Sequence, residues 1–250
     1  MKRTFVIDHL PECARHYREG WAVAAVDVIR ATTMAITAAS LGRKCYPVDT
    51  LDLAFQLASQ LSNPLLAGEL SGDMPPGFEM NNSPAALAER DDIERPLVML
   101  SSSGTRLLAN ARGCDALYLG SFRNARSLGC HLAECDHKRV ALIGAGSRGE
   151  FREEDQIGCA WIASELVRSG FEPENKNTSQ IFERWYQADA EDCLTSKSVD
   201  YLRRTDQLAD LYFILDRVND LDEIFVLDDQ CVTIAPETEW GKQFDAVASY

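Results

Sequence analysis

The sequence lacks several signals that would assign a protein to a well-known class at once. It has eight cysteines but no CxxC pair, which excludes zinc ribbons and thioredoxin-type redox motifs. It has only four histidines, too scattered for a dinuclear metal cage built on imidazoles. No apolar stretch approaches the roughly 20 residues that cross a membrane, so we expect no membrane partner.

Positive charge is also scarce. Lys and Arg total 25 against 39 Asp and Glu, and the formal net charge is −14. A surface that binds nucleic acid has to be basic, so this balance argues against a nucleic-acid partner. A small anionic substrate would need a local cluster of cations, or a bound metal, to offset the negative field of the chain.

A secretory signal pattern is missing as well, because the first eight residues hold only a short apolar run. The cysteines are spread over 250 residues, which is too long a chain for a miniature scaffold stapled by disulfides. We therefore expect reduced thiols and a cytoplasmic location.

What the sequence does contain is a repeated alternation of strand and helix patterns. Each short apolar run is followed by a polar turn and then by a helical pattern, such as residues 31–41. This order predicts an α/β fold with a mostly parallel sheet that is covered by helices on both faces. The predicted strands are residues 22–29, 44–48, 64–67, 97–100, 116–119 and 140–143.

The sequence changes in texture after residue 171. We expect residues 1–171 to form the α/β core with the active-site loops, and residues 172–250 to pack on the same core. Within the second part, the polar residues 172–180 predict a linker or exposed loop. Short helices are predicted over residues 181–218, and two closing strands near residues 224–227 and 231–234.

Polar groups recur directly after the predicted strands, where an open parallel sheet binds its ligands. Taken singly, each group could be an ordinary helix cap or turn. Their recurrence at successive strand ends favours a common site. The groups are Asp27, Arg30 and Thr32; Glu69 with a long loop to Asn82; Ser102, Ser103, Gly104, Thr105 and Arg106; Arg123 and Asn124; and Gly144–Gly149 with Arg148, followed by Glu154 and Asp155.

This mixture of groups has a chemical logic. Hydroxyls and backbone N–H groups at the start of a helix can cradle a phosphate, and Arg30 or Arg106 can hold its oxygens through two parallel hydrogen bonds. Asp27, Glu69 and Asp155 are hard oxygen ligands that suit Mg²⁺ better than zinc. Mg²⁺ would neutralise the carboxylates and the phosphate together. The sequence therefore predicts a magnesium-dependent phosphatase that acts on a small anionic phosphate ester.

Other phosphatase chemistries find no support. No cysteine is followed by an arginine at the C-x5-R spacing of thiolate phosphatases. The segment Asp27-Val-Ile lacks the second aspartate of the DxD motif that marks phosphoryl-aspartate enzymes. A covalent phospho-aspartate at Asp27 nevertheless stays open as an alternative to direct attack by water.

Two alternative functions remain open at this point. Gly144-Ala-Gly146-Ser-Arg-Gly149 matches GxGxxG after a strand, which would suit a dinucleotide-dependent oxidoreductase. That interpretation needs a helix that opens at the turn, whereas Glu150 to Asp155 bring carboxylates to the place of the pyrophosphate. The second alternative is a non-catalytic protein that binds small anions.

The same segments together resemble the 2-phosphosulfolactate phosphatase (ComB-like) family. They cover most of residues 24–165 in the order of the family, and several motifs in order are more specific than any one of them. The tail beyond residue 172 matches only weakly. The matching residues are Asp27-Val-Ile-Arg30-Ala-Thr32-Thr33, Gly68-Glu69, Gly77-Phe78 with Asn82-Ser83-Pro84, Ser103-Gly104-Thr105-Arg106, Ser121-Phe122-Arg123-Asn124, and Glu154-Asp155 through Cys159-Ala160.

The resemblance implies a three-layer α/β/α fold and magnesium-dependent hydrolysis of 2-phospho-3-sulfolactate to 3-sulfolactate and phosphate. In methanogens this step belongs to coenzyme M biosynthesis. The chain departs from the family's usual Thr-Thr-Asn-Gly-Thr at residues 101–105, and from a usual glycine at Asn81 and at Trp161. These positions surround the expected pocket, so the departures bear on the substrate more than on the type of reaction.

The resulting hypothesis gives each group a role. Asp27, Glu69 and Asp155 bind one Mg²⁺ directly or through water, and Asp27, Arg30 and Glu154 are the catalytic residues. The substrate is bound by Thr32, Asn82, Ser102, Ser103, Gly104, Thr105, Arg106, Arg123, Asn124 and Arg148. A homodimer is the default expectation, because two-fold dimers are the commonest soluble oligomers.

Overall fold

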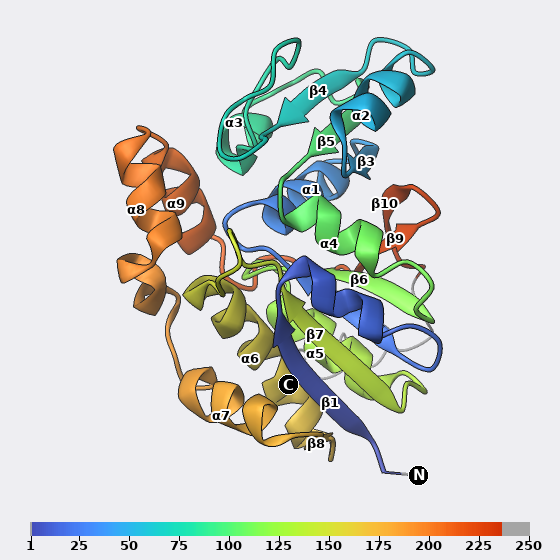
Figure 1. The fold of residues 1–250 in the computed structure, drawn as a ribbon, viewed down its shortest axis with the longest axis vertical. Coiled ribbons are helices and arrows are strands. Elements are labelled where there is room, and N and C mark those ends of the chain that lie inside the picture. Colours follow the sequence, from blue (N-terminus) through green and yellow to red (C-terminus); the bar gives the residue numbers. More distant parts are fainter. Residues whose placement is uncertain (1, 237–250) are drawn as a thin grey trace, which may run out of the picture.

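The computed structural model describes residues 2–236, so residues 237–250 of the expected second part lie outside the described residues. Within the described range, ten strands form one sheet in the order β4-β5-β3-β10-β9-β6-β2-β7-β1-β8, and helices cover both of its faces (Figure 1). This arrangement confirms the predicted three-layer α/β fold with a mostly parallel sheet.

All eight strands that the sequence predicted are present, with ends that differ by one to three residues. The strands are β1 Thr4–His9, β2 Ala22–Val26, β3 Cys45–Val48, β4 Leu65–Gly68, β5 Leu97–Leu100, β6 Ala116–Gly120, β7 Arg139–Gly144, β8 Glu172–Pro173, β9 Phe225–Asp228 and β10 Cys231–Ile234. The helices are α1 Ala31–Ser40, α2 Leu51–Ala58, α3 Pro84–Ala88, α4 Gly104–Asn110, α5 Ala125–Glu134, α6 Glu153–Arg168, α7 Lys176–Trp185, α8 Lys197–Arg204 and α9 Leu208–Leu215, with 3₁₀ helices η1 Pro11–His16 and η2 Ala190–Thr195.

Alternating side chains of the central strands supply the two halves of the core. Phe5 and Ile7 of β1 pack in a cluster with α5, α6 and α7, whereas Val6 between them packs in the cluster that contains α1 and α4. A strand turns successive side chains to opposite faces, so strands buried on both faces must be apolar throughout. This is why the predicted strands stand out as continuous apolar runs.

The two strands predicted near the end of the sequence lie in the middle of the sheet, not at an edge. β9 and β10 form an antiparallel hairpin between β3 and β6. The pairings β3–β10, β10–β9 and β9–β6 are all antiparallel. The sheet thus consists of two parallel halves, β4-β5-β3 and β6-β2-β7-β1-β8, which pair within residues 2–236 only through this hairpin.

Residues 172–180 were predicted to be a linker, and this prediction is wrong. Glu172 and Pro173 form β8, which pairs with β1, and residue 176 begins α7. The Asn175 side chain caps α7 by accepting a hydrogen bond from Thr178 N at 2.9 Å. The segment is short in apolar residues because α7 buries only one narrow face, so its composition resembled that of a loop. Strand β1 was not predicted either, because its apolar run is short.

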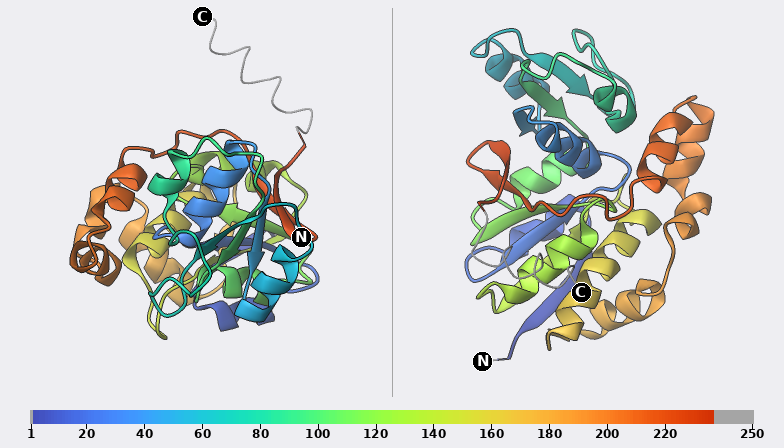
Figure 2. Two further views of the ribbon diagram at one scale, coloured as in Figure 1. Left: turned by 90° about the horizontal axis from the view of Figure 1, so that it is seen from above. Right: turned by 180° about the vertical axis from the view of Figure 1, so that it is seen from behind.

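Helices α8 and α9 stand beside the sheet next to α3 (Figure 1; Figure 2, right). They come after α7 and η2 in the sequence. The second part of the chain therefore first packs α7 against β1 and then runs to the half of the sheet that is drawn uppermost in Figure 1, where α9 contacts α3. No helix among residues 2–236 combines the length and the apolar character needed to cross a membrane.

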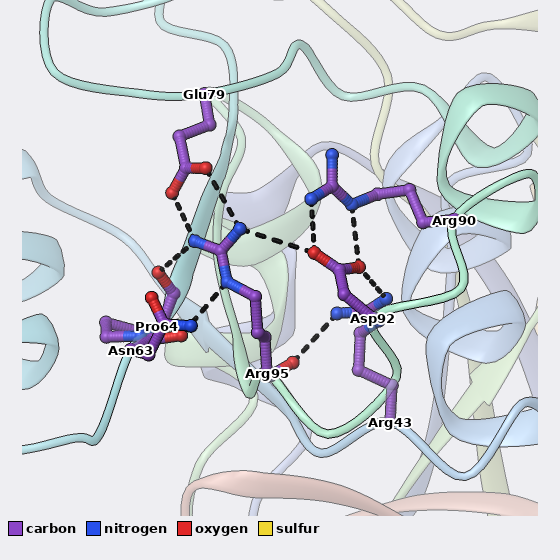
Figure 3. Close-up of polar contacts among 7 residues, drawn as sticks. All are labelled: Arg43, Asn63, Pro64, Glu79, Arg90, Asp92 and Arg95. Atoms are coloured by element: carbon purple, nitrogen blue, oxygen red, sulfur yellow. Dashed lines mark hydrogen bonds and ion pairs between the residues drawn. The ribbon is translucent and has the colours of Figure 1, made fainter.

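A cluster of charged side chains joins the loops at the amino ends of β3, β4 and β5 (Figure 3). Asp92 lies at its centre and accepts hydrogen bonds from Arg43 Nη2 at 2.8 Å, Arg90 Nε at 2.9 Å and Arg95 Nη1 at 3.3 Å. Arg95 also donates to Glu79 Oε2 at 3.0 Å. The hydrogen bonds from Arg90, followed by those from Arg43, hold the pKa of Asp92 well below its ordinary value.

Arg43 and Arg95 also satisfy backbone carbonyls in the loops before β4 and β5. Arg95 donates to the carbonyl oxygens of Asn63 and Pro64, and Arg43 donates to that of Arg95. The Arg43 side chain is fully buried, which a guanidinium tolerates only when carboxylates and carbonyls surround it. We call the set Arg43, Arg90, Asp92 and Arg95 the arginine cluster.

Candidate active site

A cavity of about 920 Å³ opens where the two halves of the sheet bring their carboxyl ends together. Its wall contains residues that directly follow β2, β4, β5 and β7, namely Asp27, Glu69, Ser101 and Ala145. Residues of η1 and α8 complete the wall. The rule that an open α/β sheet binds ligands beyond its strand ends therefore applies to both halves at once.

Asp27 and Asp155 form the acidic floor of the cavity. Asp27 Oδ1 accepts a hydrogen bond from Ala31 N at 3.2 Å, at the start of α1, and Asp27 Oδ2 accepts none from the described residues. Asp155, in the first turn of α6, accepts from Val28 N at 2.9 Å and Gly146 N at 3.0 Å. The residues are 6% and 3% exposed, so both carboxylates are largely removed from water.

Burial and mutual repulsion disfavour negative charge on this floor. Burial raises the pKa of Asp27 to about 7, and the nearby carboxylates of Glu69 and Glu154 contribute to the rise, while the Ala31 amide and Arg30 oppose it. Burial, followed by the charges of Asp27 and Glu154, raises the pKa of Asp155 well above its ordinary value. Such a set of acids is stabilised by a cation or by protons.

Gly104 makes room for the Asp27 carboxylate. A Cβ at Gly104 would overlap Asp27 Oδ2 and the Ala31 methyl group. The loop that starts α4 can therefore approach the floor only because residue 104 is glycine.

Glu69 organises the serine turn after β5. Its Oε1 accepts hydrogen bonds from Ser101 Oγ at 3.1 Å and Ser102 N at 2.7 Å. Its Oε2 accepts from Ser102 Oγ at 3.0 Å and Gly72 N at 2.7 Å. Four donors already occupy this carboxylate, so it fixes the geometry of the loops around residues 69–73 and 101–103.

Arg30 lines the cavity beside the acidic floor, although the residue is only 4% exposed. Its Nη1 pairs with Asp210 Oδ2 and donates to Gln207 Oε1 at 2.7 Å. Its Nε and Nη2 make no hydrogen bond to the described residues, and neither atom is sealed from solvent. Two donors of a held guanidinium therefore face the cavity.

The lining of the cavity is also rich in cations. Seven of the 25 Lys and Arg residues line this one cavity, against six carboxylates, whereas the whole chain carries an excess of acids. The cations are Arg30, Arg106, Arg148, Arg152, Lys197, Arg203 and Arg204.

Most of these cations have a carboxylate partner, but two do not. Arg106 pairs with Glu12 at 2.6 Å, and Lys197 pairs with Glu150 at the same distance. Among the described residues, Arg148 and Arg204 form no ion pair with any carboxylate. Arg204 donates only to the Asp200 carbonyl, and Arg148 lies 3.5 Å from the Ser71 carbonyl.

Helix α8 is held at the mouth by a contact with the loop after β4. Tyr201 Oη donates to the Gly72 carbonyl at 2.6 Å, and a Cβ at Gly72 would press on the same tyrosine. Lys197, Tyr201 and Arg204 recur at the i, i+4, i+7 spacing that places side chains on one helix face. This spacing is visible in the sequence, but the sequence does not show that this face of α8 lies near the carboxyl ends of the strands.

Six of the residues assigned to the site from the sequence do not line the cavity. Thr105 and Asn124 bond locally: Thr105 Oγ1 donates to Ser101 O at 2.7 Å, and Asn124 Nδ2 to Leu119 O at 3.0 Å. Thr32 Oγ1 lies close to Asp27 O at 2.9 Å and to Gly120 O at 2.6 Å, and so ties the end of β2 to the end of β6. Gly104 acts by its small size. Arg123 turns away to Asp220 and Thr37. These residues support the turns on which the lining residues stand.

Glu154 is the sixth, and it lies behind the acidic floor. It is fully buried, and neither carboxylate oxygen has a hydrogen-bond partner among the described residues. Burial raises the pKa of Glu154, which favours its neutral form in a wall that already holds two acids. The other predicted residues, Asp27, Arg30, Glu69, Asn82, Ser102, Ser103, Arg106, Arg148 and Asp155, do line the cavity.

The glycine turn after β7 is unsuited to a dinucleotide. Ser147 and Glu150 form a tight bridge, and α6 begins only at Glu153 with three acids in its first turn. The Gly146 amide, which would contact a pyrophosphate, donates instead to Asp155. The geometry therefore argues against the oxidoreductase alternative.

The position of the acids bears on the binding of a metal ion. No set of three or more His, Cys, Asp or Glu side chains within residues 2–236 is grouped closely enough to enclose an ion. The charge of Asp27 nevertheless contributes to the raised pKa of Asp155, and Asp27 Oδ2 accepts from none of the described donors. Mg²⁺ commonly takes only one or two carboxylates and completes its shell with water and phosphate oxygens, so this pair fits it.

Comparison with known proteins adds independent evidence. A 37% identical protein from Carboxydothermus hydrogenoformans matches over 151 residues, which is 60% of this chain and 62% of that protein. A protein from Symbiobacterium thermophilum is 34% identical over 64% of this chain and 69% of its own length. A protein from Prochlorococcus marinus is 29% identical over 71% of this chain and 76% of its own length. All three are named probable 2-phosphosulfolactate phosphatase.

The match spans less than two thirds of the first of these relatives, whereas the family comparison covers more of the chain. The family model described as 2-phosphosulpholactate phosphatase matches residues 8–229. That range runs from the end of β1 to the hairpin in the middle of the sheet and includes every residue that lines the cavity. The chain therefore belongs to the 2-phosphosulpholactate phosphatase family.

Proposed function

We propose that this protein hydrolyses 2-phospho-3-sulfolactate to 3-sulfolactate and phosphate with the help of Mg²⁺. The observation that carries the proposal is the division of charge in one cavity, with buried acids on the floor and cations on the wall and at the mouth. A phosphate ester with further anionic groups matches this division, because its charges need both a counter-ion and guanidinium donors. Family membership supports the same reaction.

Asp27 and Asp155 are the residues that would hold Mg²⁺, with Glu69 reaching it through water. The ion would neutralise the two buried carboxylates and draw charge from the phosphoryl oxygens. Arg30 presents Nε and Nη2 to the phosphoryl group, while the serine turn contributes the hydroxyl of Ser103 and nearby backbone amides. Water, oriented by the Asp27 carboxylate, attacks phosphorus in line as the bond from phosphorus to the ester oxygen breaks. The ester oxygen takes a proton and leaves as the 2-hydroxyl of 3-sulfolactate, and the oxygen of the water stays on the phosphate.

The unpaired cations at the mouth would receive the remaining anions of the substrate. Arg148 and Arg204 lack carboxylate partners among the described residues, so binding a sulfonate or carboxylate there breaks no ion pair seen in the structure. Arginine is well suited to such groups because its planar fork binds two oxygens together. Substrate selectivity would thus reside in α8 and in the loop after β7, apart from the phosphoryl site.

The test is phosphate release by the purified protein. We expect 2-phospho-3-sulfolactate to be turned over faster than 2-phospholactate, which lacks the sulfonate. We expect a chelator to stop release and added Mg²⁺ to restore it. Equal activity with excess chelator would contradict the role of the ion, and no release from either ester with any divalent metal would contradict the proposed reaction.

A further inference from the structure

The carboxylate of Asp210 in α9 is buried and joins three distant segments of the chain. The residue is 2% exposed and is 180 positions away from Arg30, its ion-pair partner. Its other oxygen, Oδ1, accepts from Ser83 Oγ at 2.6 Å and from Ala85 N at 3.0 Å. Asp210 does not line the cavity, so both of its oxygens serve protein groups and none is left for a ligand.

The Arg30 side chain depends on this contact. Its hydrogen bonds to the described residues all leave from Nη1, towards Asp210 and Gln207 of the α9 region. A guanidinium is rigid and planar, so fixing Nη1 on two acceptors also fixes the directions of Nε and Nη2. Those two nitrogens are the donors that face the cavity.

Asp210 also holds a second part of the cavity wall. Ser83 caps α3 by accepting from Ala86 N at 3.1 Å, and Asn82 next to it lines the cavity. One carboxylate thus sets both the direction of Arg30 and the position of the turn that carries Asn82.

We infer that Asp210 is a positioning residue that aims Arg30 at the phosphoryl group of the substrate. The inference rests on the proposed function, in which Arg30 binds phosphoryl oxygens. An arginine of a binding site works only when supporting contacts hold it in its productive geometry, and here the support comes from a part of the chain far away in sequence.

The experiment compares Asp210→Asn with the unaltered protein. Asparagine keeps the shape and can still accept from Ser83, but it removes the charge that holds Arg30. We expect the KM for 2-phospho-3-sulfolactate and the Kd for inorganic phosphate to rise about tenfold, as for the loss of a charge-assisted contact. Asp210→Glu, which keeps the charge, should recover part of the affinity.

Two comparisons separate positioning from simple stability. In an Arg30→Lys background, Asp210→Asn should have little further effect on the Kd for phosphate, because the group through which it acts is already altered. Asp92→Asn in the arginine cluster removes another aspartate–arginine contact, one that lies away from the cavity. It should lower the melting temperature without changing the KM or the Kd.

Each result supports or overturns the inference. If Asp210→Asn melts earlier but keeps the KM and the Kd within twofold, the contact is structural and the inference is overturned. The inference also fails if the effect of Asp210→Asn adds fully to that of Arg30→Lys. If Asp210→Asn does not fold, Asp210→Glu replaces it, since the longer side chain shifts the carboxylate from its place beside Nη1, and an unchanged Kd would overturn the inference. If the unaltered protein binds phosphate but releases none from the ester, the proposed reaction fails while the Kd still tests Asp210.

Discussion

The amino ends of strands β3, β4 and β5 hold charge in one way, and the cavity at the carboxyl ends of the sheet holds it in the opposite way. At the amino ends, the arginine cluster surrounds Asp92 with three guanidinium groups, and hydrogen bonds lower the pKa of that carboxyl. At the cavity, Asp27 and Asp155 lie buried beside other acids, and their pKa values are raised. Both clusters are shielded from water at least in part, but only the first is neutralised by the protein itself.

The difference distinguishes carboxylates that stabilise the fold from carboxylates that are available to bind a ligand. A shielded carboxylate that already has its cations stabilises the fold and has no reason to bind anything else. A buried carboxylate without them costs stability until a cation or a proton arrives, which is typical of functional sites. The comparison predicts that substitutions at the two ends will affect stability and activity in opposite senses.

The largest effect is expected for Asp27→Asn. Removing a carboxylate that would hold Mg²⁺ and orient the attacking water should reduce kcat on the order of 10³-fold. The metal-free variant should at the same time melt at a higher temperature than the unaltered protein at pH 8, because a buried charge has been removed. Phosphate release and calorimetric melting would measure the two effects.

The pH dependence of this stability gain follows from the raised pKa. Asp27 has a pKa of about 7 in the folded protein, against 3.8 as an ordinary aspartate, so its ionisation above pH 4 favours the unfolded chain. The gain in Asp27→Asn should therefore be largest at pH 8 and should shrink towards pH 5. A variant that is less stable than the unaltered protein at pH 8 without metal would contradict this account.

Asp92→Asn should show the reverse pattern. Three arginines lose their shared partner, so the free energy of unfolding should fall by about 2 kcal/mol, while kcat/KM stays within twofold. Urea unfolding at pH 7 together with phosphate release would measure both. A clear loss of catalytic efficiency in a folded variant would break the distinction between the two clusters.

Acid should remove the contribution of Asp92 in the unaltered protein. Its folded pKa is lowered, so the stabilisation is fully present above the ordinary pKa of 3.8 and is lost as the pH falls below it. Urea midpoints of the unaltered protein and of Asp92→Asn should therefore differ at pH 6 and converge as the pH falls towards 2. If the urea midpoints of the two proteins differed by the same amount at every pH in this range, the pKa of Asp92 would not be lowered by its arginine partners.

A smaller effect is expected from the unpaired cations at the mouth. Arg204→Ala or Arg148→Ala should raise the KM for 2-phospho-3-sulfolactate about tenfold, as for the loss of a charged hydrogen bond, but should change the KM for 2-phospholactate less. Arg168→Ala is a matched control, because Arg168 pairs with Glu165 on the exposed side of α6. Equal increases in KM for both substrates would show that these arginines do not bind the sulfonate.

Arg106→Ala should have the smallest effect. Arg106 lines the cavity, but it is half-exposed and already paired with Glu12, and exposed pairs contribute little. We expect the KM to rise less than threefold, as measured by initial rates at several substrate concentrations. A tenfold rise would mean that the substrate displaces Glu12 and that Arg106 belongs to the phosphate site.

The sequence was sufficient to predict the cavity residues that come shortly after a single strand. Asp27, Glu69, Ser102 and Asp155 could be found because each follows a buried strand directly or opens the helix after it, and parallel strands bring such positions together. The predicted residues that do not line the cavity show the limit of this rule. Arg123 and Asn124 also follow a strand, but the sequence does not reveal that one turns to Asp220 and the other closes its own turn.

Contacts between distant parts of the chain could not be predicted. The direction of Arg30 is set by Asp210 and Gln207, and the cations of α8 reach the mouth because Tyr201 holds that helix to Gly72. The segment 172–180 was misread for a related reason. Its strand is defined by pairing with β1 and its helix by a single buried face, and neither gives a strong local pattern.

The hairpin of β9 and β10 also bears on how the protein is made. Strands β3 and β6 touch the hairpin and not each other, so the two halves of the sheet share no direct pairing until residues 225–234 are available. On the ribosome, more than two hundred residues must be synthesised before the sheet can become continuous. Until then the nascent chain carries two sets of unpaired strand edges, which exposes it to aggregation.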